Sequence, residues 1–457
     1  MMRQPHGVAP LTARLEPWME QVLADADGCS ALLEEYGSPV NLLDLAALRR
    51  NAEELAEPAR RHGVDLLIQV ARKANKALAV VDAARELGLG IDVGGQDELL
   101  QVLGRGVDPR RVVLTAAVKP ISLLRLCLEH DVLCALDNLD EAEELSGLAR
   151  QQGVRARVAL RIPPDPDSGL PPSRFGLLAE QWLQWLAGAP AVEVEGIHFH
   201  LHGYAALDRV TMLGRALVLV DELRARGHHP SNIDIGGGVP MSYLDDGQQW
   251  QDFWTAHHAA LETGQPITWR GHPLSNVYPY HQAPVRGVWL DEVLGAGLLG
   301  GSVAEQLRGR GLQLRCEPGR AMLDGCGMTL ARVVMRKQTS DGLDLVGLEM
   351  NRTQCRSTSD DFMVDPLLAR PGTAGAPSDP VEAWLVGAYC IEAELILQRR
   401  IAFPDGVAVG DVIALPNTGG YLMHILESAS HQMPLARNLV RGTDGGFRLD
   451  AIDLGGT

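Results

Sequence analysis

Residues 66–78 read LLIQVARKANKAL, an apolar run of strand length that is followed at once by three basic side chains. Leu66, Ile68 and Val70 are typical of a buried β-strand, and Lys73 comes just after it. A buried ammonium group is costly unless it is paired, deprotonated or used in chemistry. Lys73 is therefore either a solvated residue at a strand end or a reactive amine, and the surrounding sequence has to decide between the two.

The segment at 66–71 is the first of eight apolar strand candidates that alternate with helical patterns such as ALAVVDAAREL and RALVLVDELRARG. Such alternation predicts parallel βαβ units, and eight units predict a closed (β/α)8 barrel over residues 46–325. An open, doubly wound sheet is the alternative. The other seven candidates are GIDVG, VVLTAA, LCALDN, RVALRI, GIHFHL, IDIGG and LQLRCE.

The pattern changes after residue 325, where strands follow one another across turns without long helices. GMTLARVVMRK, DLVGLEM, VEAWLVGAYC and GDVIALP predict an all-β domain over 326–457. Residues 1–45 are expected to be an N-terminal leader ending in a strand that joins this β-domain. The connection at about 239–312 is long and rich in aromatic residues and histidine, so it is either a lid or pocket wall, or a packing insertion.

Composition and charge exclude several classes of function. The 457 residues are 46% hydrophobic and 22% charged, as in globular proteins. With 41 basic and 58 acidic residues, the net charge of −17 argues against non-specific binding to nucleic acid or anionic membranes. No segment approaches the roughly 18 apolar residues of a membrane span. Seven scattered cysteines without CxxC spacing, and the lack of an apolar signal core, predict a cytoplasmic location. With nucleic acid and membranes disfavoured, a small-molecule substrate is expected.

Barrel active sites lie at the C-terminal ends of the strands, and the chain gathers reactive side chains there. The backbone of the glycine run at 236–238 can approach an anion, and Arg320 follows the next strand, so we expect a phosphate site. A phosphate anchor together with Lys73 indicates pyridoxal 5'-phosphate (PLP) held as a Schiff base. Glu317 beside the ring nitrogen would keep that nitrogen protonated, which suits decarboxylation, whereas an arginine there would favour a racemase.

The run HFHLH at 198–202 has a second interpretation. Alternate histidines on one strand share a face and can hold a metal ion, as in metal-dependent hydrolases. The other strand ends offer glycines and EPGR instead of a further histidine. Stacking on a cofactor ring therefore suits His200 better.

Taken together, these motifs make the chain similar to the alanine-racemase-like, fold type III PLP enzymes, and within them to the diaminopimelate and ornithine decarboxylases. The motifs that carry the resemblance run from YGSPVNLLDL to NTGGYLMH. The resemblance implies a (β/α)8 barrel with a C-terminal β-domain, and an obligate homodimer with shared active sites. The residues that it assigns to the cofactor are Lys73, Asp92, Glu98, His200, Gly236, Gly237, Gly238, Glu317, Arg320 and Tyr421.

The resemblance also assigns residues to catalysis and to the substrate. Cys390 in GAYCIEAE matches a catalytic cysteine that comes from the partner subunit, and Glu394 follows four residues later. Ile391 stands where the family has an acid that reads the distal amine of the substrate. Val70 and Arg72 are further departures, in the motif around the cofactor lysine.

The segment MNRTQCRSTSDDFMVDP at 350–366 departs most from the family pattern. Arg352 and Arg356 are candidate carboxylate ligands, and Asp360 or Asp361 is a candidate for the missing acid. A polar surface loop is the alternative. The departures favour a larger, carboxylate-bearing substrate, such as a citrate-conjugated diamino acid of siderophore assembly.

We therefore expect a PLP-dependent amino-acid decarboxylase in which Lys73 binds the cofactor. Cys390, helped by His200, is expected to control protonation of the α-carbon. The alternatives are a PLP-dependent racemase or epimerase, a metal-dependent hydrolase and a non-catalytic homologue.

Overall fold

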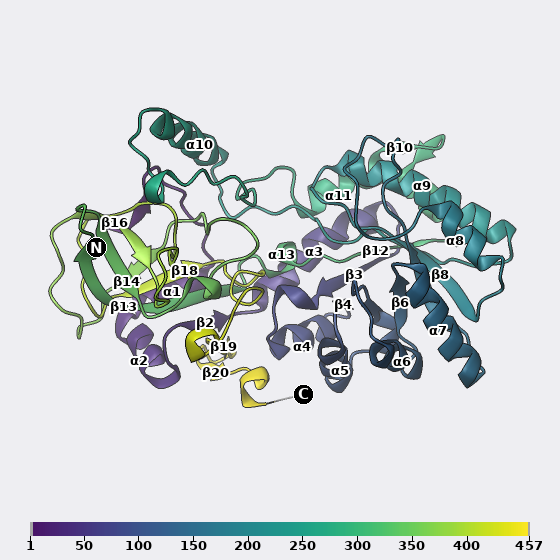
Figure 1. Ribbon diagram of the computed structural model, residues 1–457, viewed down its shortest axis with the longest axis horizontal. Helices are drawn as coiled ribbons and strands as arrows, with labels where there is room; N and C mark the ends of the chain where they lie inside the picture. The colour runs from purple at the N-terminus through teal and green to yellow at the C-terminus, as the bar shows by residue number, and fades with distance from the viewer. Residues whose placement is uncertain (1–2, 456–457) are drawn as a thin grey trace.

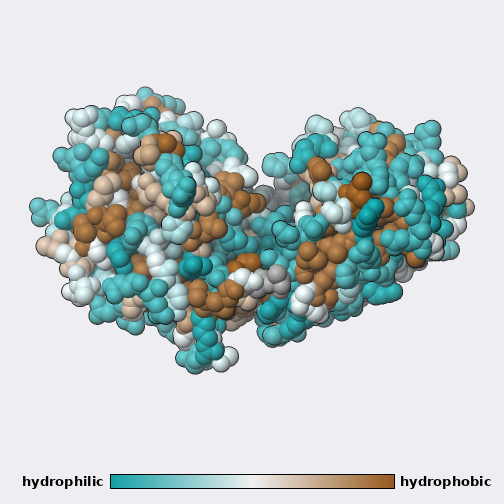
Figure 2. Space-filling view, turned by 60° about the horizontal axis from the view of Figure 1, so that its bottom comes forward, coloured by the Kyte–Doolittle hydropathy of each residue, from teal (hydrophilic) through white to brown (hydrophobic). Residues whose placement is uncertain are grey.

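The computed structural model describes residues 3–455, which form a barrel and a β-domain lying side by side (Figure 1). The space-filling view shows two lobes separated by a notch (Figure 2). Within the described residues, no helix combines the length and the apolarity needed to cross a membrane.

Eight parallel strands close into the barrel, and they are the eight segments predicted from the sequence. Their Val-, Ile- and Leu-rich runs are buried on both faces, as expected for a parallel sheet covered by helices. The predicted fold class is confirmed. In order around the barrel, the strands are β3 (Leu66–Ala71), β4 (Gly90–Val93), β5 (Val112–Leu114), β6 (Leu133–Leu136), β7 (Ala156–Arg161), β8 (Val192–His198), β9 (Asn232–Asp234) and β12 (Gln313–Cys316).

Helices surround this barrel (Figure 1). Their ends follow ordinary capping chemistry: the Asn138 side chain accepts a hydrogen bond from the amide of Glu141, and Gly153 ends the same helix in the left-handed conformation. The helices are α3 (Ala46–Arg61), α4 (Leu78–Glu86), α5 (Gln96–Gly104), α6 (Ile121–Glu129), α7 (Leu139–Gln152), α8 (Ala179–Leu186), α9 (Ala206–Ala225), α11 (Arg286–Gly295) and α12 (Val303–Gly309).

The β-domain is built around one long strand, β13, which pairs with β2, β14 and β18. The N-terminal segment belongs to this sheet, because β2 pairs antiparallel with β13 and parallel with β19. The strands are β1 (His6–Gly7), β2 (Val40–Leu43), β13 (Gly327–Gln338), β14 (Asp344–Leu348), β15 (Leu367–Ala369), β16 (Val381–Val386), β17 (Ile401–Phe403), β18 (Val412–Pro416), β19 (Arg437–Arg441) and β20 (Phe447–Leu449).

Residues 1–45 contain two helices that the sequence analysis did not predict, α1 (Pro17–Ala24) and α2 (Ala26–Tyr36). Trp18 and Leu33 pack with Leu42 and Met328 in one apolar cluster beneath the sheet. These helices are short, so tertiary burial rather than propensity stabilises them.

The long connection between β9 and β12 serves both domains. Helix α10 (Gly247–Glu262) lies beside the β-domain (Figure 1), where Phe253 packs under the guanidinium group of Arg399. In contrast, α11 packs on α3 and α9 and belongs to the barrel's helical layer. The rest of the connection carries the small hairpin β10 (Gly297–Leu298) and β11 (Gly301–Ser302), and a separate short helix, α13 (Arg320–Leu323), follows β12.

Candidate active site

A cavity of about 230 Å³ lies between the C-terminal ends of the barrel strands and the β-domain. The barrel contributes Lys73, His200 and Glu317 to its wall. The wall is completed by Leu201, His202, Gly203, Tyr204, Gly237, Gly238, Val239, Tyr278, Gly319, Arg320, Ser357, Thr358, Tyr421 and Ile425. The cavity therefore needs both domains and the β9–β12 connection.

Lys73 follows β3 and presents its amine to this cavity, with 43% of its side chain exposed. Its Nζ atom donates to Oδ2 of the buried Asp92 at 2.6 Å, and the Thr115 hydroxyl donates to the other carboxylate oxygen. Burial opposes a charge on the amine, but Asp92 and Glu317 outweigh it and raise the pKa of Lys73. Lys73 is thus an oriented amine with a fixed counter-ion.

Arg72 has a structural role that explains its unusual position in the motif. The side chain is buried and donates to the backbone carbonyls of Asn75 and Lys76 and, at 2.9 Å, to the side chain of Gln101. These bonds fix the turn that carries Lys73.

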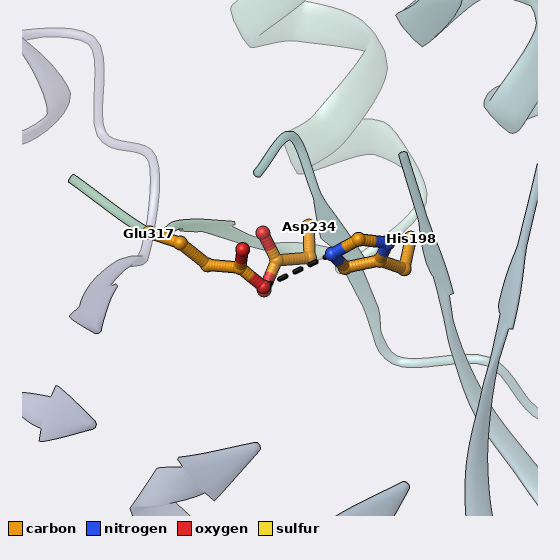
Figure 3. Close-up of side chains that lie close together, drawn as sticks. All are labelled: His198, Asp234 and Glu317. Carbon is orange, nitrogen blue, oxygen red and sulfur yellow. Dashed lines mark hydrogen bonds and ion pairs between the residues drawn. The ribbon is translucent and has the colours of Figure 1, made fainter. Parts of the chain in front are cut away.

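Three buried side chains lie close together below the cavity: His198, Asp234 and Glu317 (Figure 3). Nε2 of His198 lies 3.0 Å from Oε1 of Glu317. Burial and the nearby Asp92 raise the pKa of Glu317 to about 8, and burial and Glu317 raise the pKa of Asp234 to about 7. Burial and Arg161 lower the pKa of His198 to about 4. At neutral pH the cluster thus holds a neutral imidazole, a mostly protonated Glu317 and an Asp234 carboxyl group that is close to its midpoint of ionisation.

This cluster should make the stability of the cofactor-free protein depend on pH. The pKa of Glu317 rises from 4.5 to about 8 on folding. Its contribution to the free energy of unfolding is therefore fully present below about pH 4.5 and is lost as the pH rises through about 8. The linked loss has an upper bound of about 5 kcal/mol. Denaturant unfolding should show a free energy of unfolding that falls between about pH 5 and pH 8. The Glu317→Gln variant should lose the part of that fall that Glu317 contributes, while the part from Asp234, whose pKa is raised to about 7, remains. An unchanged slope would contradict the assignment.

His200 and the glycine run form one wall of the cavity. The amide of Gly237 donates to Nδ1 of His200 at 3.1 Å, which fixes the orientation of the imidazole ring. Burial and the Lys73 charge lower the pKa of His200 to about 3, so its ring is neutral. Gly236 and Gly238 have φ values of +68° and +74°, a region that glycine adopts without strain. Added Cβ atoms would clash here, 2.6 Å from the Phe199 carbonyl oxygen at position 236.

Arg320 lies at the same end of the cavity among tyrosines. Its Nη1 atom donates to the Tyr243 hydroxyl at 3.2 Å, and its guanidinium carbon is 4.0 Å from the centre of the Tyr278 ring. The Tyr421 ring is 5.2 Å away. This cation faces no carboxylate within ion-pair distance in residues 3–455, so it remains free to meet an anion.

Comparisons with known proteins agree with this geometry. Residues 47–266 match the model of the pyridoxal-dependent decarboxylase family, pyridoxal binding domain. The uncharacterized protein y4yA of Sinorhizobium fredii is 33% identical over 407 residues, covering 88% of this chain and 87% of that protein. The chain belongs to the fold type III pyridoxal-dependent decarboxylases. Diaminopimelate decarboxylase of Pseudomonas aeruginosa is 27% identical over 416 residues, covering 88% and 87% of the two chains.

Solved structures of decarboxylases share this fold. The diaminopimelate decarboxylase of M. jannaschii, in complex with L-lysine, superposes with a TM-score of 0.72 at 19% identity and covers 96% of this chain and 94% of its own. The lysine/ornithine decarboxylase of Vibrio vulnificus, in complex with putrescine, gives 0.66 at 17% identity, covering 93% and 99%.

The cofactor of this decarboxylase is PLP, and the residues of the cavity fit it. A lysine amine opens into the cavity from one side, and the proton-holding carboxyl of Glu317 lines its floor. At the other end, the backbone of Gly237 and Gly238 and the guanidinium group of Arg320 line the wall together. These are the features that an aldehyde, a ring nitrogen and a phosphate group require.

Several residues predicted for this decarboxylase lie outside the cavity wall. Glu98 accepts the amide of Gly94 at 2.7 Å and caps the turn after β4. Arg352 donates its amide to Glu394 at 2.8 Å and its guanidinium to the carbonyl of Ala393 at 3.0 Å. The polar loop thus folds back on its own chain.

The other three substrate candidates are held in the same way. Arg356 donates to the carbonyls of Leu395 and Ile396, and Asp361 is buried and accepts the amide of Gln398 at 2.8 Å. Asp360 accepts the amide of Asn276 at 2.8 Å, which ties its loop to the β9–β12 connection. Within one chain, none of these side chains lines the cavity, and each has hydrogen-bond partners elsewhere in its own chain, so their part in substrate binding stays a prediction. Ser357 and Thr358 from the same loop reach the cavity instead.

Cys390 is exposed, unlike the six other cysteines, and does not line the cavity of its own chain. Its Sγ atom lies 3.3 Å from Nε2 of His431, whose ring stacks on Tyr389 at 4.7 Å. The neighbouring Ile391 is 45% exposed. A thiol and an apolar side chain displayed together on the surface are consistent with burial against another subunit.

Sequence reasoning missed some residues of the site and underused others. Asp234 ends β9, two residues before the first glycine of the run, so its position at a strand end was a usable signal. His198 appeared only as a possible metal ligand. Tyr204, Tyr278, Ser357 and Thr358 could not be found in this way, because they reach the cavity through loops whose path depends on domain packing.

Proposed function

We propose that this decarboxylase acts on an α-amino acid whose far end accepts hydrogen bonds, such as a carboxylate, rather than ending in a free amine. The observation that supports this most is that the site, within residues 3–455, lacks a second acidic side chain that could pair with a distal amine of the substrate. Ile391 follows the cysteine in place of the family's acid, and among the described residues Glu317 is the only carboxylate in the cavity wall. An ammonium group buried there would lack a partner.

The remaining wall suits an acceptor. Ser357, Thr358 and Tyr204 carry hydroxyl groups that can donate to a carboxylate. The named relatives include diaminopimelate decarboxylases. Diaminopimelate bears both a carboxylate and an amine at its far end, so it meets the requirement through the carboxylate alone. A conjugate of a diamino acid with a polycarboxylate, of the kind used in siderophores, fits the same requirement.

Each cavity residue has a proposed part in the reaction. Lys73 would bind the cofactor aldehyde, and the backbone of Gly236–Gly238, together with Arg320 and Tyr421, would hold its phosphate group. PLP, when bound, supplies the electron sink that accepts the electrons left when the α-carboxylate departs. Glu317 would hold the ring nitrogen in its protonated form, with His198 positioning the carboxyl group. Asp92 orients the amine of Lys73, and His200 would lie against the ring.

A second subunit is proposed to complete the site. Cys390, exposed on its own chain, would enter the partner's cavity and deliver a proton to the α-carbon. Ile391 would then face the far end of the substrate. All seven cysteines are free of disulfide bonds, which supports the expected cytoplasmic location.

Carbon dioxide release from a substrate panel tests the proposal. We expect turnover of diaminopimelate or citryl-diaminopropionate to exceed that of lysine, ornithine and arginine, with a borohydride-reduced sample as the inactive control. Replacing Ile391 with Asp should raise kcat/KM for lysine or ornithine by about 10-fold, because it supplies a counter-ion for the distal amine. Preferred turnover of ornithine by the unaltered protein would contradict the substrate class. Exchange of the α-proton without carbon dioxide release would indicate a racemase instead.

A further inference from the structure

Arg209, on helix α9 behind the glycine run, is a buried cation without a counter-ion. Its side chain is fully buried, and its Nε and Nη1 atoms have no hydrogen-bond partner. Across residues 3–455 it forms no ion pair with any carboxylate, and its nearest aromatic neighbour is Trp289, with the guanidinium carbon 5.8 Å from the ring centre. Burial therefore lowers the pKa of Arg209 to about 10. Such a charge is costly to bury unless something else in the functional protein compensates for it.

The third nitrogen of this guanidinium group, Nη2, donates hydrogen bonds to three backbone carbonyl oxygens. Nη2 of Arg209 donates to the carbonyl oxygens of Leu201 at 3.5 Å, Gly237 at 3.3 Å and Gly238 at 3.4 Å. Two loops that follow different strands, β8 and β9, are thereby fastened to one side chain.

Holding these carbonyls also fixes where the next amides point. In a trans peptide unit the carbonyl of one residue and the N–H of the next point in opposite directions. The three carbonyls bound by Arg209 turn towards it, so the amide of each following residue points away from it. These following residues are His202, Gly238 and Val239. These three residues line the cavity, and no partner for their amides is found within residues 3–455.

We propose that Arg209 organises the phosphate-binding loops of this protein. It positions three backbone amides toward the cofactor phosphate, and its own unpaired charge is compensated by that dianion across the glycines. Arg209 is thus a positioning residue: it lies outside the cavity wall and acts through the backbone. Gly238 has to be glycine for the same reason, since a Cβ there would lie 2.2 Å from Nη2. The inference rests on the proposal that these glycines face the phosphate.

Comparing two ligands that differ only in the phosphate tests this role. Dissociation constants of PLP and of pyridoxal, measured on the cofactor-free protein by quenching of tryptophan fluorescence, give a ratio that isolates the phosphate contribution. In the Arg209→Met variant we expect PLP to bind roughly 10- to 100-fold more weakly, with pyridoxal within about twofold of wild type. Any internal hemiacetal of free pyridoxal affects every variant equally and cancels from the comparison.

Further variants separate the charge from the scaffold. Arg209→Gln keeps an amide donor for the carbonyls but removes the charge, so we expect an intermediate loss of PLP affinity. This variant also serves if Arg209→Met fails to fold. Arg224→Gln is the matched control, because Arg224 lies on the same helix and also donates to two backbone carbonyls, those of Pro230 and Arg310, away from the cavity wall. Its PLP-to-pyridoxal ratio should equal that of wild type.

Inorganic phosphate gives a second readout that does not involve the aldehyde or activity. Millimolar phosphate should raise the melting temperature of the cofactor-free wild type, and this shift should vanish in Arg209→Met. An equal loss of PLP and pyridoxal affinity would reveal a merely structural role and overturn the inference, as would unchanged PLP affinity. If wild type itself binds pyridoxal as tightly as PLP, the proposed phosphate site is wrong, which is a distinct failure.

Discussion

Replacing Lys73 with alanine is expected to lower carbon dioxide release by at least about 10³-fold, because the amine that holds the cofactor aldehyde is removed. The structure makes this amine difficult to replace: it opens into the cavity and is aimed by Asp92 at 2.6 Å. After borohydride treatment, mass spectrometry of the unaltered protein should find the reduced cofactor on the peptide that contains Lys73.

The control for this change is Lys76→Ala, three residues further on. Lys76 pairs with Glu427 and does not line the cavity, so its loss should leave the cofactor attached and the activity within a few-fold of wild type. Substantial turnover by the Lys73→Ala protein would remove the basis for the proposed site.

Mixing two inactive variants extends this prediction to the subunit arrangement. If Cys390 works in the partner's cavity, an equal mixture of Lys73→Ala and Cys390→Ala subunits should recover about one quarter of wild-type activity. Half of the dimers would be mixed, and each mixed dimer would hold one intact site. A mixture that stays inactive after subunit exchange, verified by native mass spectrometry, would show that the two residues do not meet across an interface.

Replacing Glu317 with glutamine should lower kcat by about 10²-fold, corresponding to about 3 kcal/mol of lost stabilisation of the departing electron pair. The carboxyl can ionise when it meets a protonated ring nitrogen, while an amide cannot. The raised pKa of Glu317, about 8, arises from burial and Asp92, so a cation is the partner that this position lacks. Steady-state kinetics with the best substrate of the panel would measure the effect.

The matched control for Glu317→Gln is Glu141→Gln, a buried carboxyl in the first turn of α7 that pairs with Lys119 and does not line the cavity. It should alter stability more than kcat. PLP affinity and the absorption spectrum should show that the Glu317→Gln protein still binds the cofactor. An unchanged kcat would argue that the ring nitrogen does not depend on this carboxyl group.

The sequence by itself determined the barrel and the core of the site. Parallel strands covered by helices need apolar residues on both faces, so β3 to β12 read as short continuous apolar runs that could be recognised one by one. Since the C-terminal ends of such strands converge, Lys73, His200 and Glu317 could be placed in one cavity from their positions after the strands. The glycine run at 236–238 could be recognised in the same way, because it directly follows a strand, and the structure gives Gly236 and Gly238 positive φ values.

Tertiary structure alone decided which polar side chains remain free. Arg352, Arg356 and Asp361 look like ligands in the sequence, but the fold places them outside the cavity wall with hydrogen-bond partners in their own chain, while Ser357 and Thr358 from the same loop reach the cavity. Arg209 looks like an ordinary helix residue, yet it is buried beneath the glycines and no carboxylate in residues 3–455 pairs with its charge. Strand patterns are local and periodic, whereas the pairing of a charge depends on which distant segments fold against it, and a single sequence does not encode that in any local pattern.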